Sequence, residues 1–405
     1  ADIYSWALKR SGGPDLLTED PKNKLVPRYF LYQIAPWGGE CVTMNDSNQP
    51  DGAGALMYTI ADNKDGVGLW TWLRMWGPEG TKTYSDGPGI ASLAYSLIFA
   101  DPALKPVHPA EVKMPLNFVF SGGRGSFRSS WTDDLAGMAT FTCGFDQHRG
   151  HNHKDENSFT FFARGERFVI DPAYRPFDTQ SHNTVLVDGQ MQHREGKQYD
   201  VYGKVLACKD YGDAWSIAGQ AKDAFAKDVG LAKAVRHLLF VKADTPYLVV
   251  ADDYEKSSGE DADYTWLLHT DKKNRLQVGP APGQATILGA RRGAVCRIQF
   301  LQPDKGLTLS ESDLTMRFIQ RSFATGPIVT STPAQPSAGY FKELQAVVRA
   351  RNPRFVAVLT AADKDADLPL VSGQGGPENM TITVKQKSGR IDTIRLTAEG
   401  LEFVK

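Results

Sequence analysis

The sequence predicts an α+β protein of more than one domain, with a helical N-terminal part followed by a large antiparallel β-sandwich region. A length of 405 residues exceeds what one hydrophobic core usually organises. Apolar residues recur at helical spacing as far as about residue 110. Short β-rich runs separated by turn residues dominate after Met114. Together these observations indicate helices first and sheets afterwards.

The helical part is predicted from apolar spacing between glycine and proline breaks. The first segment ends near Gly12-Gly13-Pro14, and the last ends before Asp101-Pro102. Five of the eight tryptophans lie in this part, where helix packing is the expected role for most of them and sugar stacking for one or two. The expected helices cover 3–17, 28–34, 54–61, 67–76 and 90–99.

The strand-rich part is predicted from short runs of β-branched and aromatic residues. Many such runs at close spacing are typical of an antiparallel sandwich. We expect three regions: a helical portion over 1–112, a sandwich containing a histidine cluster over 113–235, and a further sheet region over 236–405. The expected strands cover 116–120, 139–143, 158–163, 167–170, 184–187, 238–241, 247–251, 264–269, 296–300, 346–349 and 355–359.

Composition excludes several classes of protein. Charged residues make up 23% of the chain and the net charge is −1, which disfavours a general nucleic-acid binder. No apolar run approaches the length of a membrane span, so no membrane partner is expected. The four cysteines have neither disulfide-scaffold density nor metal-site spacing. The first residues do not resemble a signal peptide, so Ala1 is expected to begin a mature or cut chain.

A histidine cluster is the most informative chemical feature. Five of the eight histidines lie between positions 148 and 193. The strand pair expected at 159–163 and 167–170 returns the chain to its starting end, so His153 and Asp171 should lie near each other. His182 stands at the entry of the next expected strand. Two imidazoles and one carboxylate suit zinc or manganese. The alternative is a set of hydrogen-bonded histidines in polar loops.

His151 belongs to the same cluster, two residues before His153. In an extended segment these two side chains share a face, so one could bind metal while the other meets a substrate. The run His151-Asn152-His153 also suggests a metal-dependent nuclease, but its strand context and the neutral charge of the chain oppose that interpretation.

The sequence around this cluster resembles the heparinase II/III-like family. Its members include uronate polysaccharide lyases, and dermatan sulfate epimerase is similar to them. The resemblance is carried by these segments: Arg128-Ser129-Ser130-Trp131, Gly150-His151-Asn152-His153-Lys154-Asp155 with Ser158-Phe159, Gly165 through Asp171-Pro172, and Ser181-His182-Asn183-Thr184-Val185-Leu186-Val187-Asp188-Gly189. It covers roughly residues 1–270 and implies an α/α toroid followed by an antiparallel β-sandwich. The helical part of this chain is short, so we expect an incomplete toroid.

The resemblance also implies roles for single residues. His153, Asp171 and His182 match positions that hold one divalent metal, with zinc the first choice and manganese or calcium as alternatives. His151 matches a histidine that faces the substrate, and Tyr174 a tyrosine of the epimerase-like branch.

Three further residues are expected to bind substrate. Arg128 and Arg175 are candidate clamps for carboxylate or sulfate, since the arginine fork matches such groups, and Asn152 is a candidate contact beside them. For Arg175 an ordinary ion pair is the stronger alternative.

The leading functional hypothesis is a lyase that cleaves uronic-acid glycans, such as heparin, heparan sulfate or alginate, by β-elimination. One alternative is a uronate C5-epimerase, and another is a non-catalytic carbohydrate-binding portion of a split lyase. The expected partner is an anionic polysaccharide, together with a homo-oligomer or a separate N-terminal toroid fragment. The substrate class implies a periplasmic or secreted protein.

Overall fold

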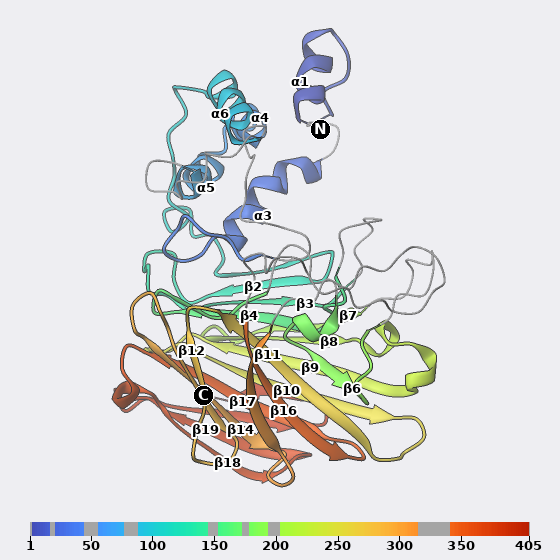
Figure 1. Ribbon diagram of the computed structural model, residues 1–405. Coiled ribbons are helices and arrows are strands. Elements are labelled where there is room, and N and C mark those ends of the chain that lie inside the picture. The colour runs from blue at the N-terminus through green and yellow to red at the C-terminus, as the bar shows by residue number, and fades with distance from the viewer. Residues whose placement is uncertain are drawn as a thin grey trace. The chain divides into compact units, whose positions relative to one another are not determined.

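The computed structural model describes residues 2–16, 21–43, 56–76, 88–144, 153–171, 178–192, 203–314 and 341–404. The chain divides into two compact units. Unit 1 holds the helices (residues 1–43, 47–118 and 130–134), and unit 2 holds nearly all strands (residues 44–46, 119–129 and 135–405). The predicted order of helices first and antiparallel sheets afterwards is confirmed (Figure 1).

Unit 1 is built from short helices that share one hydrophobic core. Trp76, Ile60 and Phe99 are among its buried members, and Trp6 and Trp72 pack against them. Core packing, the role expected for most of the tryptophans, is thus confirmed for these three. The described helices are too few to close a toroid of helix pairs, as expected. They are α1 (Asp2–Arg10), the 3-10 turn η1 (Pro21–Leu25), α3 (Val26–Gln33), α4 (Leu56–Asp62), α5 (Gly66–Trp76) and α6 (Pro88–Phe99).

Unit 2 contains most of a five-stranded sheet that carries the histidine cluster. Its strands run in sequence order, so each is joined to its neighbour by a direct connection. The strand β4 is buried along its whole length, which fits the continuous apolar and aromatic run in its sequence. The members are β1 (Asn117–Phe120), β2 (Arg124–Arg128), β3 (Met138–Thr142), β4 (Ser158–Ala163) and β5 (Glu166–Val169).

An eight-stranded antiparallel sheet forms the largest layer of unit 2. Its central strands are almost fully buried, and its edge strand β7 is mostly exposed. In sheet order the members are β12 (Arg275–Val278), β13 (Gln284–Leu288), β14 (Val295–Gln302), β17 (Arg354–Ala362), β10 (Tyr247–Lys256), β9 (Leu231–Val241), β8 (Ala214–Gln220) and β7 (Lys204–Asp210).

Two four-stranded sheets complete unit 2. The C-terminal sheet packs on the eight-stranded one through a shared core that includes Leu239, Val358 and Ile382. Trp266 of β11 contacts Phe159 of β4 and Phe300 of β14, which joins three of the sheets. The sheets are β15 (Thr308–Leu314), β16 (Phe341–Ala350), β11 (Ala262–Asp271) and β6 (Val185–Val187), and then β18 (Leu370–Gly376), β19 (Asn379–Lys385), β20 (Ile391–Thr397) and β21 (Gly400–Phe403).

The division expected between residues 235 and 236 does not coincide with a break in the structure. Both residues lie inside β9, which pairs with β8 on one side and with β10 on the other. A sheet that is continuous through its hydrogen bonds cannot separate at such a point, so the chain from 135 onward forms one unit.

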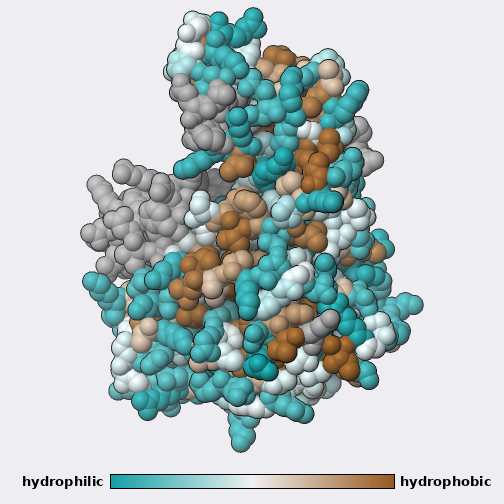
Figure 2. All heavy atoms as spheres, turned by 180° about the vertical axis from the view of Figure 1, so that it is seen from behind, coloured by the Kyte–Doolittle hydropathy of each residue, from teal (hydrophilic) through white to brown (hydrophobic). Residues whose placement is uncertain are grey.

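The surface of the molecule is mixed in character. In the view from behind, hydrophobic residues occur in several areas interspersed with hydrophilic ones (Figure 2). In the described part of the chain, none of the helices combines the length and apolar character that a bilayer crossing requires.

Candidate metal centre

The hairpin formed by β4 and β5 places two of the predicted metal ligands. Its turn residues Arg164 and Gly165 both have positive φ, at 56° and 77°, as a tight two-residue hairpin requires. The pairing of Phe161 with Val169 returns the chain to the end of the sheet where β4 begins. His153 precedes β4 and Asp171 follows β5, so the hairpin brings both to the same end, as the sequence predicts.

The third member arrives from a separate segment. The 3-10 turn η2 (Thr179–Ser181) ends at His182, whose backbone N–H donates to the carbonyl of Thr179 at 3.1 Å. The chain then enters β6, which pairs with β11. The histidine at the entry of this strand is held between a turn and a sheet, which limits its freedom.

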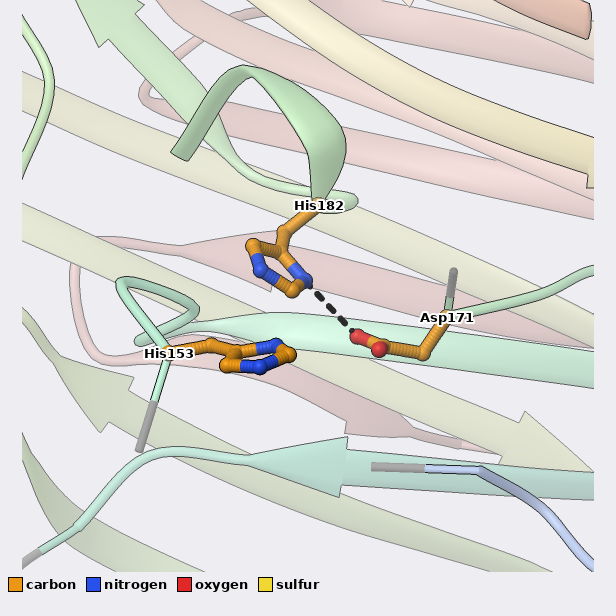
Figure 3. A group of neighbouring side chains, drawn as sticks. All are labelled: His153, Asp171 and His182. Carbon is orange, nitrogen blue, oxygen red and sulfur yellow. Dashed lines mark hydrogen bonds and ion pairs between the residues drawn. The ribbon is translucent and has the colours of Figure 1, made fainter. Parts of the chain in front are cut away.

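These three side chains converge on one point (Figure 3). One ligand atom from each of His153, Asp171 and His182 can be chosen so that all lie within 4.8 Å of one another. His182 Nδ1 lies 2.9 Å from Asp171 Oδ2, and the two imidazole rings have centroids 5.1 Å apart. The exposed fractions are 2%, 5% and 0%, so the site is buried.

The donor set fits a divalent metal. Two imidazoles and a carboxylate are common zinc ligands, with metal–ligand distances of about 2.0–2.2 Å. In a tetrahedral site such ligand atoms are about 3.3 Å apart, so only small side-chain movements separate the observed cluster from a bound state. Three protein ligands leave room for a fourth, which agrees with manganese or zinc chemistry. The identity of the metal stays a prediction.

Arg128, expected to bind substrate, lies elsewhere in the unit. It pairs with Met138 of β3, which in turn pairs with Phe162 of β4. The opposite end of the same strands carries Arg124 and Ser158, and Ser158 follows His153 closely in the chain. Arg128 is 3% exposed and its Nη2 lies 3.4 Å from Met138 Sδ. A buried arginine at the far end of the sheet is poorly placed to clamp a polymer beside the metal centre.

The other predicted residues lie outside the described residues. They are His151, Asn152, Tyr174 and Arg175. Their roles as catalytic or substrate-binding groups therefore stay predictions.

Glu156, a buried acid three residues after His153, was not predicted from the sequence. It is 7% exposed, and its carboxylate accepts the backbone N–H of Gly144 at 2.8 Å. Burial, and then the negative charge of Asp155, raise the pKa of Glu156 to about 8. The run Asp155-Glu156-Asn157 is typical of an exposed polar turn, so the local sequence does not indicate that Glu156 is buried.

Comparison with known proteins shows the family and the fold of this chain. The family described as "Heparinase II/III-like, C-terminal" matches residues 138–350. A crystal structure of heparinase III is 13% identical to this chain, with a TM-score of 0.64. The match covers 96% of this chain and 56% of the heparinase III chain. A mutant of a heparan sulfate lyase from Pedobacter heparinus is 15% identical to this chain, with a TM-score of 0.62. The match covers 98% of this chain and 58% of the lyase chain.

These solved structures share the fold at low identity, and the chain spans a little over half of their length. The family match covers more than half of this chain and includes all three residues of the metal centre. The chain belongs to the heparinase II/III-like family.

Proposed function

We propose that this chain is part of a lyase that cleaves uronic-acid-containing polysaccharides by β-elimination. The observation that carries the proposal is the buried cluster of His153, Asp171 and His182 within a heparinase II/III-like fold. The family relationship supports a glycosaminoglycan as the substrate class, and alginate is the alternative uronan. An extracellular polysaccharide implies a secreted or periplasmic protein.

The reaction needs three functions. A base removes the proton from the ring carbon that bears the carboxylate, the electron pair forms a double bond to the next carbon, and the glycosidic oxygen leaves with a proton from an acid. Negative charge develops on a group that is already anionic, so a cation must neutralise the carboxylate. We assign this neutralisation to protonated His151 and the proton transfer to Tyr174.

Asn152 and Arg175 complete the proposed contacts with the glycan. Arg128 has no role in this account, because it is buried at the opposite end of the sheet.

The metal is assigned a structural role. A bound divalent ion supplies positive charge that fixes the three ligands in place. The ligands are 0–5% exposed, which leaves little access for a substrate carboxylate. Because His151 is only two residues from His153, ordering His153 limits where His151 can lie.

The test is ultraviolet absorbance during incubation with heparan sulfate, heparin and alginate, because elimination creates a double bond conjugated to the carboxylate. We expect a rise with at least one polymer, and its loss in His151→Ala with the metal content unchanged. No rise with any uronan would contradict the proposal. Solvent deuterium entering the polymer without unsaturated ends would instead indicate a C5-epimerase.

A non-catalytic portion of a larger lyase is a second candidate. It is favoured by one observation: the chain spans 56–58% of the length of the two solved lyase-fold structures above. Binding of the polymer without turnover, and turnover after a separate toroid fragment is added, would support this candidate.

A further inference from the structure

The residue that follows His182 makes an unusual set of hydrogen bonds. Asn183 is 0% exposed, so its carboxamide has no access to water. Its Nδ2 donates to the carbonyl of Phe159 at 2.7 Å and to that of Ile170 at 2.8 Å. Its Oδ1 accepts the backbone N–H of His269 at 2.7 Å. Both N–H groups and the carbonyl oxygen of the amide are therefore satisfied.

Two of these partners, Phe159 and Ile170, belong to the segments that carry the metal ligands. Ile170 directly precedes Asp171, and Phe159 lies in β4, the strand that follows His153. The backbone N–H of Ile170 also donates to the carbonyl of His269 at 3.0 Å. One side chain thus fixes the backbone next to Asp171 relative to the backbone next to His182.

A buried arginine holds the same residue from the eight-stranded sheet. Arg236 of β9 is 0% exposed, and its Nη1 donates to the carbonyls of Asn183 and Asn157. Its Nε and Nη2 donate to the two carboxylate oxygens of Asp252 at 2.7 and 2.9 Å. Because a buried guanidinium must satisfy its N–H groups, this geometry resists displacement of either carbonyl.

We propose that Asn183 is a positioning residue for the metal centre, and that Arg236 keeps its backbone in place. The carboxamide sets the separation of His182 and Asp171 before metal binds, so that binding does not bear the full cost of ordering them. Loss of the amide should weaken metal affinity by about 10–100-fold, the range typical of groups that orient metal ligands. The inference rests on the metal centre of the proposed function.

The chain offers a matched control. Asn274 is 4% exposed, and its Nδ2 donates to the carbonyl of Arg167 at 2.9 Å and to Thr270 Oγ1 at 2.8 Å. Its Oδ1 accepts the N–H of Ala290 at 3.0 Å. Asn274 therefore makes three buried side-chain hydrogen bonds, close to the four of Asn183, whose Oδ1 also lies 3.2 Å from His269 Nδ1. None of the partners of Asn274 adjoins a metal ligand. Asn274→Ala should cost comparable stability and leave metal affinity unchanged.

The experiment measures zinc affinity by calorimetry and the visible spectrum of the cobalt(II)-substituted protein for wild type, Asn183→Ala and Asn274→Ala. Circular dichroism establishes that each variant is folded. We expect weaker zinc binding and an altered cobalt spectrum only in Asn183→Ala, since the intensity of cobalt bands reports ligand geometry. Asn183→Ser, which keeps a hydroxyl donor and leaves less empty space, is measured in the same way in case the alanine variant does not fold.

Wild-type affinity and an unchanged spectrum in a folded Asn183 variant would overturn the inference, as would an equal loss in Asn274→Ala. Absence of metal binding by the wild-type protein is a different outcome, because it would contradict the metal centre itself. The two failures are thus distinguishable.

Discussion

At the scale of the residue, the chemistry of this protein is concentrated in buried polar groups. His153, Asp171 and His182 lie together with exposed fractions of 5% or less. Without a metal, a buried imidazole pair and a carboxylate would have to be held by hydrogen bonds alone, of which His182 Nδ1 to Asp171 Oδ2 is one. A bound ion would instead make the cluster a source of stability.

Replacement of His182 by alanine tests this contribution. In the wild type, zinc at 100 times its dissociation constant should raise the free energy of unfolding by about 2.7 kcal/mol. His182→Ala should lose this zinc-dependent increase in melting temperature. His108→Ala, which changes a histidine in unit 1, should keep it. A His182→Ala protein still stabilised by zinc as strongly as wild type would show that the ion binds elsewhere.

The raised pKa of Glu156 predicts how the stability of the protein depends on pH. Its pKa is raised in the folded protein to about 8 and is about 4.3 in an unfolded chain, so the folded state binds the extra proton between these values. Stability from this group is full below pH 4.3 and is lost as the pH rises towards 8, by at most about 1.4 kcal/mol per pH unit. Chelator-treated wild type should therefore lose more stability between pH 5 and 8 than Glu156→Gln does. Parallel stability profiles for the two proteins would refute the assignment.

The residue scale also shows what the sequence could and could not predict. The proximity of His153 and Asp171 could be predicted because it depends only on two neighbouring strands and the turn between them. Arg236 lies in a different sheet, far along the chain, and nothing around it in the sequence marks it as buried. Arg128 illustrates the same point, because arginine forks suit anions but the burial of this arginine is decided by strands that pair with β2.

At the scale of the element, close packing of β8 against the turn before β4 depends on a glycine, because a side chain at that position would meet its neighbours. This glycine is Gly219 of β8. A Cβ placed there would lie 2.4 Å from Asn157 Oδ1 and 2.7 Å from Cys143 Sγ. β8 can therefore approach the turn before β4 only because this position lacks a side chain.

Gly219→Ala should destabilise the protein by about 1–3 kcal/mol, the usual cost of overpacking a core. Gly376→Ala in β18 is the control, because a Cβ at that position meets nothing within 4 Å. Chemical denaturation of both variants measures the difference. Equal stability of the two would mean that the strands move apart without penalty.

Some strands were predicted because their burial leaves a pattern, whereas β19 and β20 of the C-terminal sheet were missed although their buried and exposed residues alternate. The buried strand β4 has the bounds 158–163 that its sequence predicts. The edge strands β7 and β18, almost fully exposed, were not predicted because exposed strands lack alternation of apolar and polar residues. Exposed or short strands owe their existence to a partner strand, which local sequence does not reveal.

At the scale of the whole molecule, the two units differ in how they depend on the proposed metal. All three ligands lie in unit 2, and unit 1 has its own hydrophobic core. Chelation should therefore raise amide hydrogen exchange in 153–171 and 178–192, and leave exchange in α3, α4 and α5 unchanged. Hydrogen exchange with mass spectrometry measures both regions in one sample. A uniform increase in both units would contradict a local structural role.

The most direct test of the account is the metal content of the purified protein after incubation with excess zinc and removal of unbound ions. We predict one zinc ion per chain in the wild type, and essentially none when His153 and His182 are both replaced by alanine in a protein that remains folded by circular dichroism. Full zinc content in that double variant, or none in the wild type, would contradict the assignment of this buried cluster as the metal centre.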